Sequence, residues 1–462
     1  MALELRGYQH SIIDDVRSLM KKGVRRILIQ GPTGMGKTAL TANMIGASAK
    51  KGMRSLFMVH RRELINQSVA SFDKAGVYHG IISAGFFEDR KPLVHIASVQ
   101  SLSRRLGRIK PPKLIVWDEC HHIAAGSWSR IFDKFPNSYH VGLTATPERL
   151  DGKGLDKWFD KIIIGPTVTW LIENKYLASY RLYAPSQISL EGIRTQMGDY
   201  RKSDLVQTLD KPTITGSVIR EYMKVGYGKR AVVFAVSVDH SRHVVEQFNA
   251  NNIPSMHVDG ETPSDLRDSA IEKFRKGKIK VLSNVDLFGE GFDLPAIEIA
   301  ILLRPTQSLS LYLQQVGRAL RPSPGKDEAI ILDHVRNCER HGLPDDVREW
   351  RLEGRGKVKK GESTGTGVKI CDECFAALPV HSDKCKYCGY EFPKSPREVE
   401  HVEGELVEVD TDSSARKKYR RLQQVRAQTE EELVKLGELR GYKRPRLWAR
   451  HIMKARRQKY GK

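Results

Sequence analysis

The chain has 462 residues, of which 40% are hydrophobic and 29% charged, so it is long enough for two to four domains with their own cores. No run approaches the roughly 18 consecutive apolar residues that a membrane-spanning helix needs, and the N-terminus lacks the basic and apolar regions of a secretory signal. A net charge of +22 favours an anionic partner, in most cases a nucleic acid and less often a membrane surface. These features predict a cytoplasmic protein with no membrane partner.

Short apolar runs recur along the chain with helical stretches between them. The first set occupies residues 26–30, 55–60, 94–99, 114–119 and 140–146, and the second set occupies residues 231–236, 255–260, 281–285, 297–303 and 328–334. Runs of this length and spacing are typical of buried parallel strands joined by crossover helices. The pattern predicts an α/β fold with two successive parallel sheets flanked by helices. Their join, between residues 165 and 212, is expected to be irregular.

A glycine-rich segment comes after the first predicted strand and matches G-x-x-x-x-G-K-[ST] over residues 31–38. Glycines such as Gly34 and Gly36 let backbone N–H groups turn toward phosphate oxygens at the start of a helix. Lys37 would neutralise the β- and γ-phosphates of ATP, and the Thr38 hydroxyl would bind Mg²⁺. The segment therefore predicts a binding site for Mg²⁺ and ATP.

Two carboxylates, Asp118 and Glu119, end the fourth predicted strand. Asp118 can hold Mg²⁺, while Glu119 can orient and deprotonate the water that attacks the γ-phosphate. Cys120 precedes two histidines, but we do not interpret it as a nucleophile, because neighbours in sequence on a strand point to opposite faces. The carboxylate pair predicts the hydrolytic part of an ATP site.

These motifs resemble those of superfamily 2 helicases of the DEAD/DEAH type. Residues 118–121, Asp-Glu-Cys-His, are similar to the D-E-x-H box, and residues 143–147 are similar to the third motif, which links hydrolysis to nucleic-acid binding. Residues 6–9, Arg-Gly-Tyr-Gln, resemble the element that contacts adenine, and the resemblance places Gln9 on the base.

Two further segments of the first half, residues 60–64 and 98–101, resemble elements that hold the nucleic-acid backbone. The resemblance implies contacts from Arg61, Arg62 and Gln100 to the strand. These contacts would be made to phosphates and sugars, since a motor must bind at every register of the sequence.

The second half carries the remaining helicase motifs. Residues 289–293, Gly-Glu-Gly-Phe-Asp, resemble the fifth motif, which implies nucleotide contacts from Gly291 and Asp293. Residues 314–321 match the sixth motif, Q-x-x-G-R-x-x-R, and the match implies that Arg318 and Arg321 reach the γ-phosphate as arginine fingers.

The resemblance covers about residues 1–340 and implies two RecA-like domains, at residues 1–165 and 166–345, that hydrolyse ATP in the cleft between them. Residues 301–312, the sixth motif and a downstream cysteine cluster are most similar to RadD-type DNA helicases and related phage-encoded helicases.

Four cysteines lie within residues 368–392 in two C-x-x-C pairs: Cys371, Cys374, Cys385 and Cys388. Two such pairs can close one tetrahedral site of four thiolates, so the spacing predicts a small zinc ribbon that binds Zn²⁺. A redox dithiol and an iron–sulfur cluster are the alternatives. Cys338 and His341 form a C-x-x-H pair outside this spacing and are interpreted as ordinary surface residues.

The C-terminal tail, residues 415–462, carries seventeen Lys or Arg against four Glu. Residues 429–432, Thr-Glu-Glu-Glu, predict a capping box that opens a helix, and Pro445 can start a second helix. One face of that second helix would carry four basic side chains: Arg446, Arg450, Lys454 and Arg457. We interpret this face as a phosphate-binding surface. A solvated face and a membrane-surface helix are alternatives.

The sequence as a whole predicts an ATP-dependent DNA helicase or translocase that acts in replication, recombination or repair. Single-stranded, forked or branched DNA is the expected partner, on family resemblance, in the bacterial nucleoid or in the host cytoplasm if the protein is phage-encoded. An RNA helicase, a double-strand translocase without strand separation and a clamp without turnover are the alternatives. The set formed by Lys37, Asp118, Glu119 and Arg318 argues against the clamp.

Overall fold

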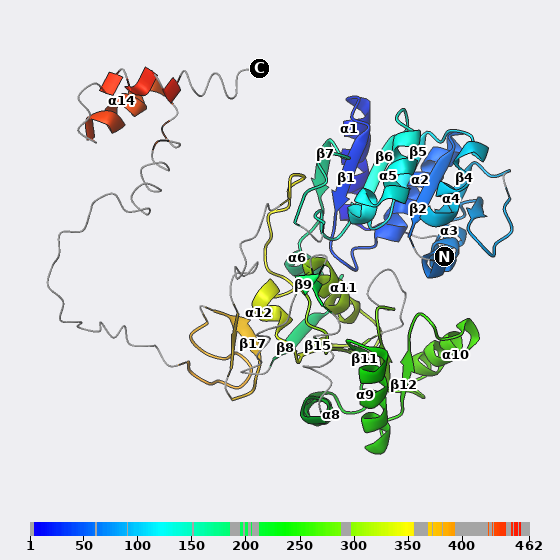
Figure 1. The fold of residues 1–462 in the computed structure, drawn as a ribbon, viewed down its shortest axis with the longest axis vertical. Coiled ribbons are helices and arrows are strands. Elements are labelled where there is room, and N and C mark those ends of the chain that lie inside the picture. The colour runs from blue at the N-terminus through cyan, green and yellow to red at the C-terminus, as the bar shows by residue number, and fades with distance from the viewer. Residues whose placement is uncertain are drawn as a thin grey trace. The chain divides into compact units, whose positions relative to one another are not determined.

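The protein is described from a computed structural model, in which the chain forms two compact units, Met1–Pro393 and Lys394–Lys462 (Figure 1). The structure describes residues 4–60, 62–89, 91–149, 152–184, 195–196, 199–201, 205, 212–287, 297–354, 368–371, 373–380, 382–392, 424, 427, 429–439, 445–446, 448–450 and 452–453. Within these residues, no helix is both long enough and apolar enough to cross a membrane.

The first half of the larger unit is built on a parallel sheet. In spatial order its strands are β3 (His79–Ile82), β4 (Val94–Ser98), β2 (Ser55–Val59), β5 (Leu114–Trp117), β6 (Tyr139–Thr144), β1 (Arg26–Gln30) and β7 (Lys161–Ile164). The connecting helices are α1 (Gly7–Lys21), α2 (Lys37–Lys50), α3 (Arg62–Lys74), α4 (Val99–Ser103) and α5 (Gly126–Lys134), with short 3₁₀ turns at Leu106–Arg108 and Cys120–Ala124.

Both faces of this first sheet are buried. Ile27 and Ile29 of β1 pack into one apolar cluster with α2 and α3, whereas Leu28 packs into a second cluster with α4 and α5. Because side chains alternate along a strand, strands such as β1, β2 and β5 contribute apolar side chains to both clusters, which explains why the sequence reads as continuous apolar runs.

The second half of the larger unit repeats the architecture. Its parallel sheet has the order β12 (Ser255–Val258), β13 (Val281–Asn284), β11 (Ala231–Phe234), β14 (Ile299–Leu302), β15 (Glu328–Asp333) and β8 (Ser179–Tyr183). Its helices are α6 (Val168–Glu173), α8 (Pro212–Gly226), α9 (Val238–Ala250), α10 (Ser264–Arg275), α11 (Leu309–Ala319) and α12 (Asn337–His341), and a two-stranded pair is formed by β9 (Thr195–Gln196) and β10 (Asp199–Tyr200). The predicted fold of two α/β domains is confirmed.

All ten strands predicted from the apolar runs are present, but three edge strands were not predicted. These are β3, β7 and β8, and β8 lies inside the join that was expected to be irregular, as does α6. Edge strands expose part of their side chains, so β7 has exposed residues at both ends and one buried residue, whereas the central strand β5 is buried throughout. An apolar run is therefore a weak signal at the edge of a sheet.

The chain crosses back to the first sheet after it has completed the second. The carbonyl of Leu352 accepts hydrogen bonds from the backbone N–H groups of Leu155 (2.6 Å) and Asp156 (3.1 Å). A Cβ atom at Gly154 would lie 1.9 Å from the same carbonyl oxygen, so the crossing requires glycine there. The buried Leu352 side chain belongs to the apolar cluster of α4 and α5. Residues 352–354, which follow the second domain in the chain, thus pack against the first domain and hold the two domains together.

The four-cysteine segment folds around a two-stranded pair, β16 (Val368–Ile370) and β17 (Ala377–Pro379). It docks on the outer edge of β8, where Tyr183 pairs with Ala376 in an antiparallel bridge and the N–H of Ala184 donates to the carbonyl of Phe375 (3.0 Å).

The smaller unit contains α14 (Glu430–Leu439), which begins with the predicted capping box. The Thr429 N–H donates to Glu432 Oε2 (3.1 Å), and the Glu432 N–H donates to Thr429 Oγ1 (3.2 Å). Residues 445–446, 448–450 and 452–453 are helical as predicted, and Pro445 and Trp448 pack against Gly437 of α14. Within the described residues, α14 and this second helical segment therefore pack against each other.

Candidate active site

The glycine-rich segment forms an open turn between β1 and α2. Gly34 and Gly36 have left-handed φ angles of 92° and 84°, and Gly36 caps α2 without any side-chain hydrogen bond. By contrast α4, α6, α9 and α11 each begin with a Ser or Thr hydroxyl that accepts from a first-turn N–H group. The N-terminus of α2 thus has no side-chain cap that competes with a phosphate for its N–H groups.

Lys37 and Glu119 face each other across this turn. Lys37 Nζ donates to the carbonyl of Gly31 (3.2 Å) and lies 4.0 Å from Glu119 Oε1. Glu119 is 7% exposed and has left-handed backbone angles, φ 46° and ψ 52°, which is a strained conformation for a residue with a side chain. Asp118 and Thr38 are half-buried at the same edge of the sheet, and the Asp118 N–H donates to the carbonyl of Met58 (3.0 Å).

His121 connects the carboxylate pair to the third motif. Its Nδ1 lies 3.4 Å from Glu119 Oε2 and 3.1 Å from Thr144 Oγ1, and Thr144 in turn donates to the carbonyl of Thr146 (2.9 Å). The sequence could not reveal this contact, because it depends on β5 and β6 being neighbours in the sheet.

Gln9 lies directly against the glycine-rich turn. Its Nε2 donates to the carbonyls of Met35 (3.0 Å) and Gly36 (3.2 Å), and the Tyr8 hydroxyl donates to Met35 as well (2.7 Å). Two aromatic residues that sequence reasoning missed, Trp170 and Tyr176, contact the Tyr8 ring edge-on. They lie more than 150 residues further along the chain, so no local pattern connects them to this turn.

The helix with the sixth motif, α11, packs against the glycine-rich turn. A Cβ atom at Gly317 would lie 2.6 Å from Cβ of Thr33, so only glycine permits this approach. Arg318, the next residue, is 4% exposed, and Arg321 is half-buried two residues beyond the end of the helix. Gly291 and Asp293 of the fifth motif lie outside the described residues.

The segments expected to hold a nucleic-acid strand meet at one point. Gln100 Nε2 donates to the carbonyl of His60 (3.1 Å), which joins the start of α4 to the end of β2. Arg61 and the side chain of Arg62 lie outside the described residues. The two segments are therefore neighbours, as the predicted shared role requires.

Buried thiols outside the cysteine cluster do not add reactive groups. Burial raises the pKa of Cys120 well above its ordinary value, and Glu119 raises the pKa further, so Cys120 stays a protonated thiol. The prediction that Cys338 and His341 are surface residues is wrong, since both are buried. His341 Nε2 bonds to the carbonyl of Thr306 (2.8 Å), and its ring stacks on Tyr312, which is a packing role.

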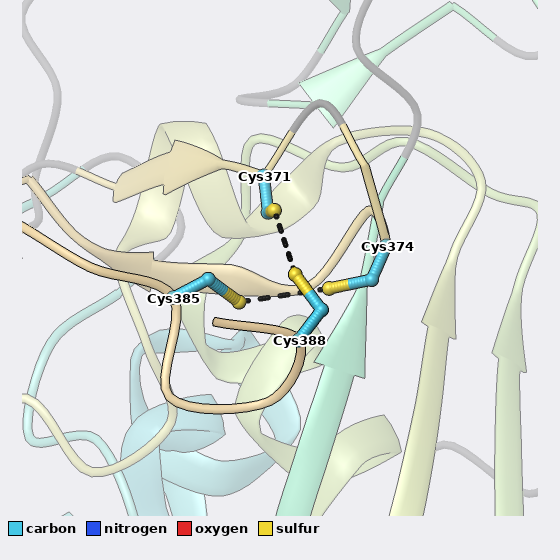
Figure 2. A group of neighbouring side chains, drawn as sticks. All are labelled: Cys371, Cys374, Cys385 and Cys388. Atoms are coloured by element: carbon cyan, nitrogen blue, oxygen red, sulfur yellow. Dashed lines mark hydrogen bonds between the residues drawn. The ribbon is translucent and has the colours of Figure 1, made fainter. Parts of the chain in front are cut away.

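The four cysteines of the cluster converge on one point (Figure 2). Their sulfur atoms all lie within 4.8 Å of one another, and the Cys371–Cys388 and Cys374–Cys385 pairs are 3.6 Å apart. Zn–S bonds of about 2.3 Å place the sulfurs of a tetrahedral site about 3.8 Å apart, so the observed spacing fits a zinc ion. Burial, and then contacts with neighbouring thiols, raise the pKa of Cys374 to about 12, whereas at Cys385 burial is outweighed by hydrogen bonds from backbone N–H groups and neighbouring thiols, which lower its pKa to about 7. Four thiolates this close repel one another unless a cation binds between them.

Two protein-family models match the chain, each on one of the two sheets. Residues 2–149 match the type III restriction enzyme res subunit, and residues 215–323 match the helicase conserved C-terminal domain. The chain is also similar to solved structures: a fragment of an HsdR subunit of a Vibrio vulnificus type I restriction enzyme superposes with a TM-score of 0.56 at 22% identity, over 71% of this chain and 64% of that chain. The structural similarity supports the fold alone.

Together with the geometry of the site, these matches show that the chain belongs to helicase superfamily 2 and is a nucleic-acid-dependent ATPase. It is 39% identical to a 51.5 kDa protein of a Lactococcus phage, over 82% of this chain and 81% of that protein. It is 31% identical to the Saccharomyces cerevisiae protein IRC3, named as an ATP-dependent helicase, but spans only 51% of its length. The Sulfurisphaera tokodaii DNA 3'-5' translocase XPB2 is 27% identical over 72% of this chain and 82% of its own. The RadD-type assignment stays a prediction.

Proposed function

We propose that the protein is an ATP-dependent DNA helicase or translocase that acts in replication, recombination or repair. One observation carries the proposal: α11, with the sixth motif, packs on Thr33 of the glycine-rich turn, close in sequence to Lys37, which faces Glu119. A site completed by two domains makes hydrolysis dependent on domain closure, as a motor requires. The name of the relative XPB2, a DNA 3'-5' translocase, supports DNA as the partner.

In the proposed mechanism the residues of the turn bind the nucleotide. The N–H groups at Gly34 and Gly36 and the Lys37 ammonium bind phosphate oxygens, and Gln9 binds adenine. Thr38 and Asp118 hold Mg²⁺, which supplies positive charge to the phosphates when it is bound. Gly291 and Asp293 add contacts from the second domain.

Glu119 is the proposed general base. It takes a proton from water while the water oxygen bonds to the γ-phosphorus and the bond to the bridging oxygen breaks. His121 and Thr144 fix the orientation of Glu119 through the contacts of 3.4 Å and 3.1 Å. Arg318 and Arg321 stabilise the negative charge that spreads over the γ-phosphate oxygens.

The proposed domain limits are residues 1–165 and 166–345 for the two RecA-like domains, 368–392 for a zinc ribbon and 415–462 for the tail. Zn²⁺ would be held by Cys371, Cys374, Cys385 and Cys388 as a structural ion. Four thiolates leave no open position for substrate.

The nucleic-acid strand is proposed to contact Arg61, Arg62 and Gln100 in the first domain. Single-stranded, forked or branched DNA is the proposed substrate. The tail would add phosphate contacts from Arg446, Arg450, Lys454 and Arg457. Arg450 Nε already pairs with Glu430 Oε1 (3.2 Å), so this contact competes with a phosphate. Such a protein would act at the bacterial nucleoid, or in the host cytoplasm if a phage encodes it.

The test is to measure ATP turnover and strand separation with single-stranded, forked, branched and duplex DNA and with RNA. We expect DNA to stimulate turnover more than RNA. Stimulation by RNA alone would contradict the proposal in favour of an RNA helicase. Stimulation by duplex DNA without any unwinding would identify a translocase that does not separate strands.

Two variants test the site itself. Lys37→Ala and Glu119→Gln should both abolish DNA-stimulated hydrolysis, but Glu119→Gln should still bind ATP, because it removes only the base. Equilibrium binding of a fluorescent ATP analogue and a phosphate-release assay separate these effects. Hydrolysis near the wild-type rate in either variant would contradict the site assignment.

A further inference from the structure

A half-buried lysine, Lys326, connects the ends of two helicase segments in the second domain. It lies in the turn between α11 and β15, and its Nζ donates to three backbone carbonyls, those of Ile297 (2.6 Å), Arg321 (2.9 Å) and Ala319. None of the sequence motifs contains this residue.

Two of the three carbonyls lie at or just beyond the end of the helix with the sixth motif. Ala319 is the last residue of α11, and Arg321 comes directly after its C-cap, Leu320. The last four carbonyls of a helix have no partner within the helix, and they carry the negative end of its dipole. An ammonium group, with three donors and a positive charge, satisfies both needs.

The third carbonyl belongs to a different segment. Ile297 is the first described residue after the segment that contains the predicted fifth motif. The ammonium of Lys326 thus connects two segments: one that follows the fifth motif, at Ile297, and one at the end of the sixth motif, at Ala319. These two residues are 22 positions apart in the sequence.

We propose that Lys326 is a positioning residue for ATP hydrolysis, whose ammonium holds the end of α11 so that Arg318 and Arg321 are presented to the nucleotide. The inference rests on the proposed role of these two arginines. Arg321 lies outside the helix, so the contact of its own carbonyl with Lys326 fixes the backbone from which its guanidinium extends. A shift of about 1 Å in such a group can cost about 10²-fold in rate.

The charge of Lys326 makes the arrangement sensitive to pH. Burial lowers the pKa of Lys326 to about 8, and the neighbouring charges oppose one another: Glu298 raises the pKa, whereas Arg230 and Lys229 lower it. Below this pKa the ammonium has three donors for three carbonyls. Above it the neutral amine has two, and one carbonyl loses its partner.

The test compares Lys326→Met and Lys326→Arg with the wild-type full chain. Lys326→Met should lower kcat by about 10²-fold while the dissociation constant of a fluorescent ATP analogue changes less than about threefold. Wild-type kcat should fall as pH rises through 8. Lys326→Arg should restore much of the activity and remove this fall, because a guanidinium stays charged. Lys278→Met, at an exposed lysine of the same domain, is the matched control.

Two results would overturn the inference: wild-type turnover in Lys326→Met, or the same pH profile in Lys326→Arg as in the wild type. The comparison of the pH profiles of Lys326→Arg and the wild type tests the inference even if Lys326→Met does not fold. Arg318→Ala and Arg321→Ala are measured alongside. If they leave kcat unchanged, the proposed function fails; if they lower it while the Lys326 variants do not, only the positioning role fails.

Discussion

The strands β1 and β8 occupy equivalent places in two sheets that share the connectivity of six strands, yet they support different functions. The first sheet runs β3-β4-β2-β5-β6-β1-β7, and the second runs β12-β13-β11-β14-β15-β8, so each strand except β7 has a counterpart in chain order. β1 leads into the glycine-rich turn and is covered at its outer side by β7. β8 leads into Ala184, and its outer side is bridged by the cysteine-rich segment.

The strand itself therefore determines only where the residues that follow it lie in the domain. The chemistry comes from the residues after the strand and from the segment that covers its edge. At β1 the glycines leave the start of α2 open to an anion. At β8 the exposed edge is closed by residues 375–376, which removes unpaired backbone groups that could pair with another chain. The second domain packs on the glycine-rich turn through Gly317 of α11, and its proposed contribution to the ATP site comes from this helix.

The largest expected effect comes from separating the second domain from the turn at β1. Gly317→Val introduces a side chain where a Cβ atom would lie 2.6 Å from Thr33. The arginines would move away from the nucleotide, so turnover should fall about 10³-fold or more while nucleotide still binds to the first domain. Stopped-flow phosphate release and equilibrium nucleotide binding measure the two effects. Gly260→Val, with no atom within 4 Å of its Cβ position, is the control, and equal turnover in both variants would contradict the packing of α11 on the turn.

Removing the metal tests the role of the cysteine-rich segment at β8. Elemental analysis should find one zinc per chain, and Cys385→Ser should release it. Loss of the ribbon uncovers the β8 edge, so we expect a lower melting temperature, by about 2–4 °C for each kcal/mol of stability lost in a domain of this size. Lys386→Ala, at an exposed residue of the same knuckle, should melt like the wild type. Iron in place of zinc, or no metal at all, would refute the site.

Acid should destabilise both domains over the same pH range, because each contains a buried neutral histidine. Burial lowers the pKa of His140 in the first sheet and of His334 after β15 to about 4. In the unfolded chain these groups take up a proton near pH 6.5, whereas in the folded chain they stay neutral until about pH 4. The free energy of unfolding is therefore highest above pH 6.5 and decreases as pH falls toward 4. The loss should be about 3 kcal/mol for each histidine. Urea unfolding at pH 7, 5.5 and 4.5 measures it, and a pH-independent midpoint would contradict the burial of both rings.

The smallest effect is expected in the tail. If four basic side chains bind phosphates, deleting residues 413–462 should flatten the plot of log binding constant against log salt by about 3–4 units, without loss of basal ATPase activity. Arg446→Ala should reduce the slope more than Arg450→Ala, because Arg450 is paired with Glu430. An unchanged slope in the truncated protein would show that the tail is a solvated or partner-binding helix.

The sequence was sufficient for ten strands, all of them central except β12, since side chains such as those of β5 are buried on both faces and read as continuous apolar runs. It was also sufficient for the glycine-rich turn, the carboxylate pair and the cysteine cluster, because each is a local pattern. It could not predict β8, whose residues are mostly half-exposed. Nor could it predict contacts between distant segments, such as Thr33 with Gly317, His121 with Thr144 or the carbonyls around Lys326, because these depend on which strands and helices become neighbours.

The most direct test of a site shared by two domains is the turnover of Arg318→Ala with saturating ATP and DNA. Arg318 belongs to α11, but every other proposed group at the γ-phosphate except Arg321 belongs to the first domain. We expect the dissociation constant for nucleotide to change only a few-fold and turnover to fall by about 10³–10⁵, the range found for arginine fingers. Turnover within tenfold of the wild type, with normal nucleotide binding, would mean that the first domain hydrolyses ATP without the second.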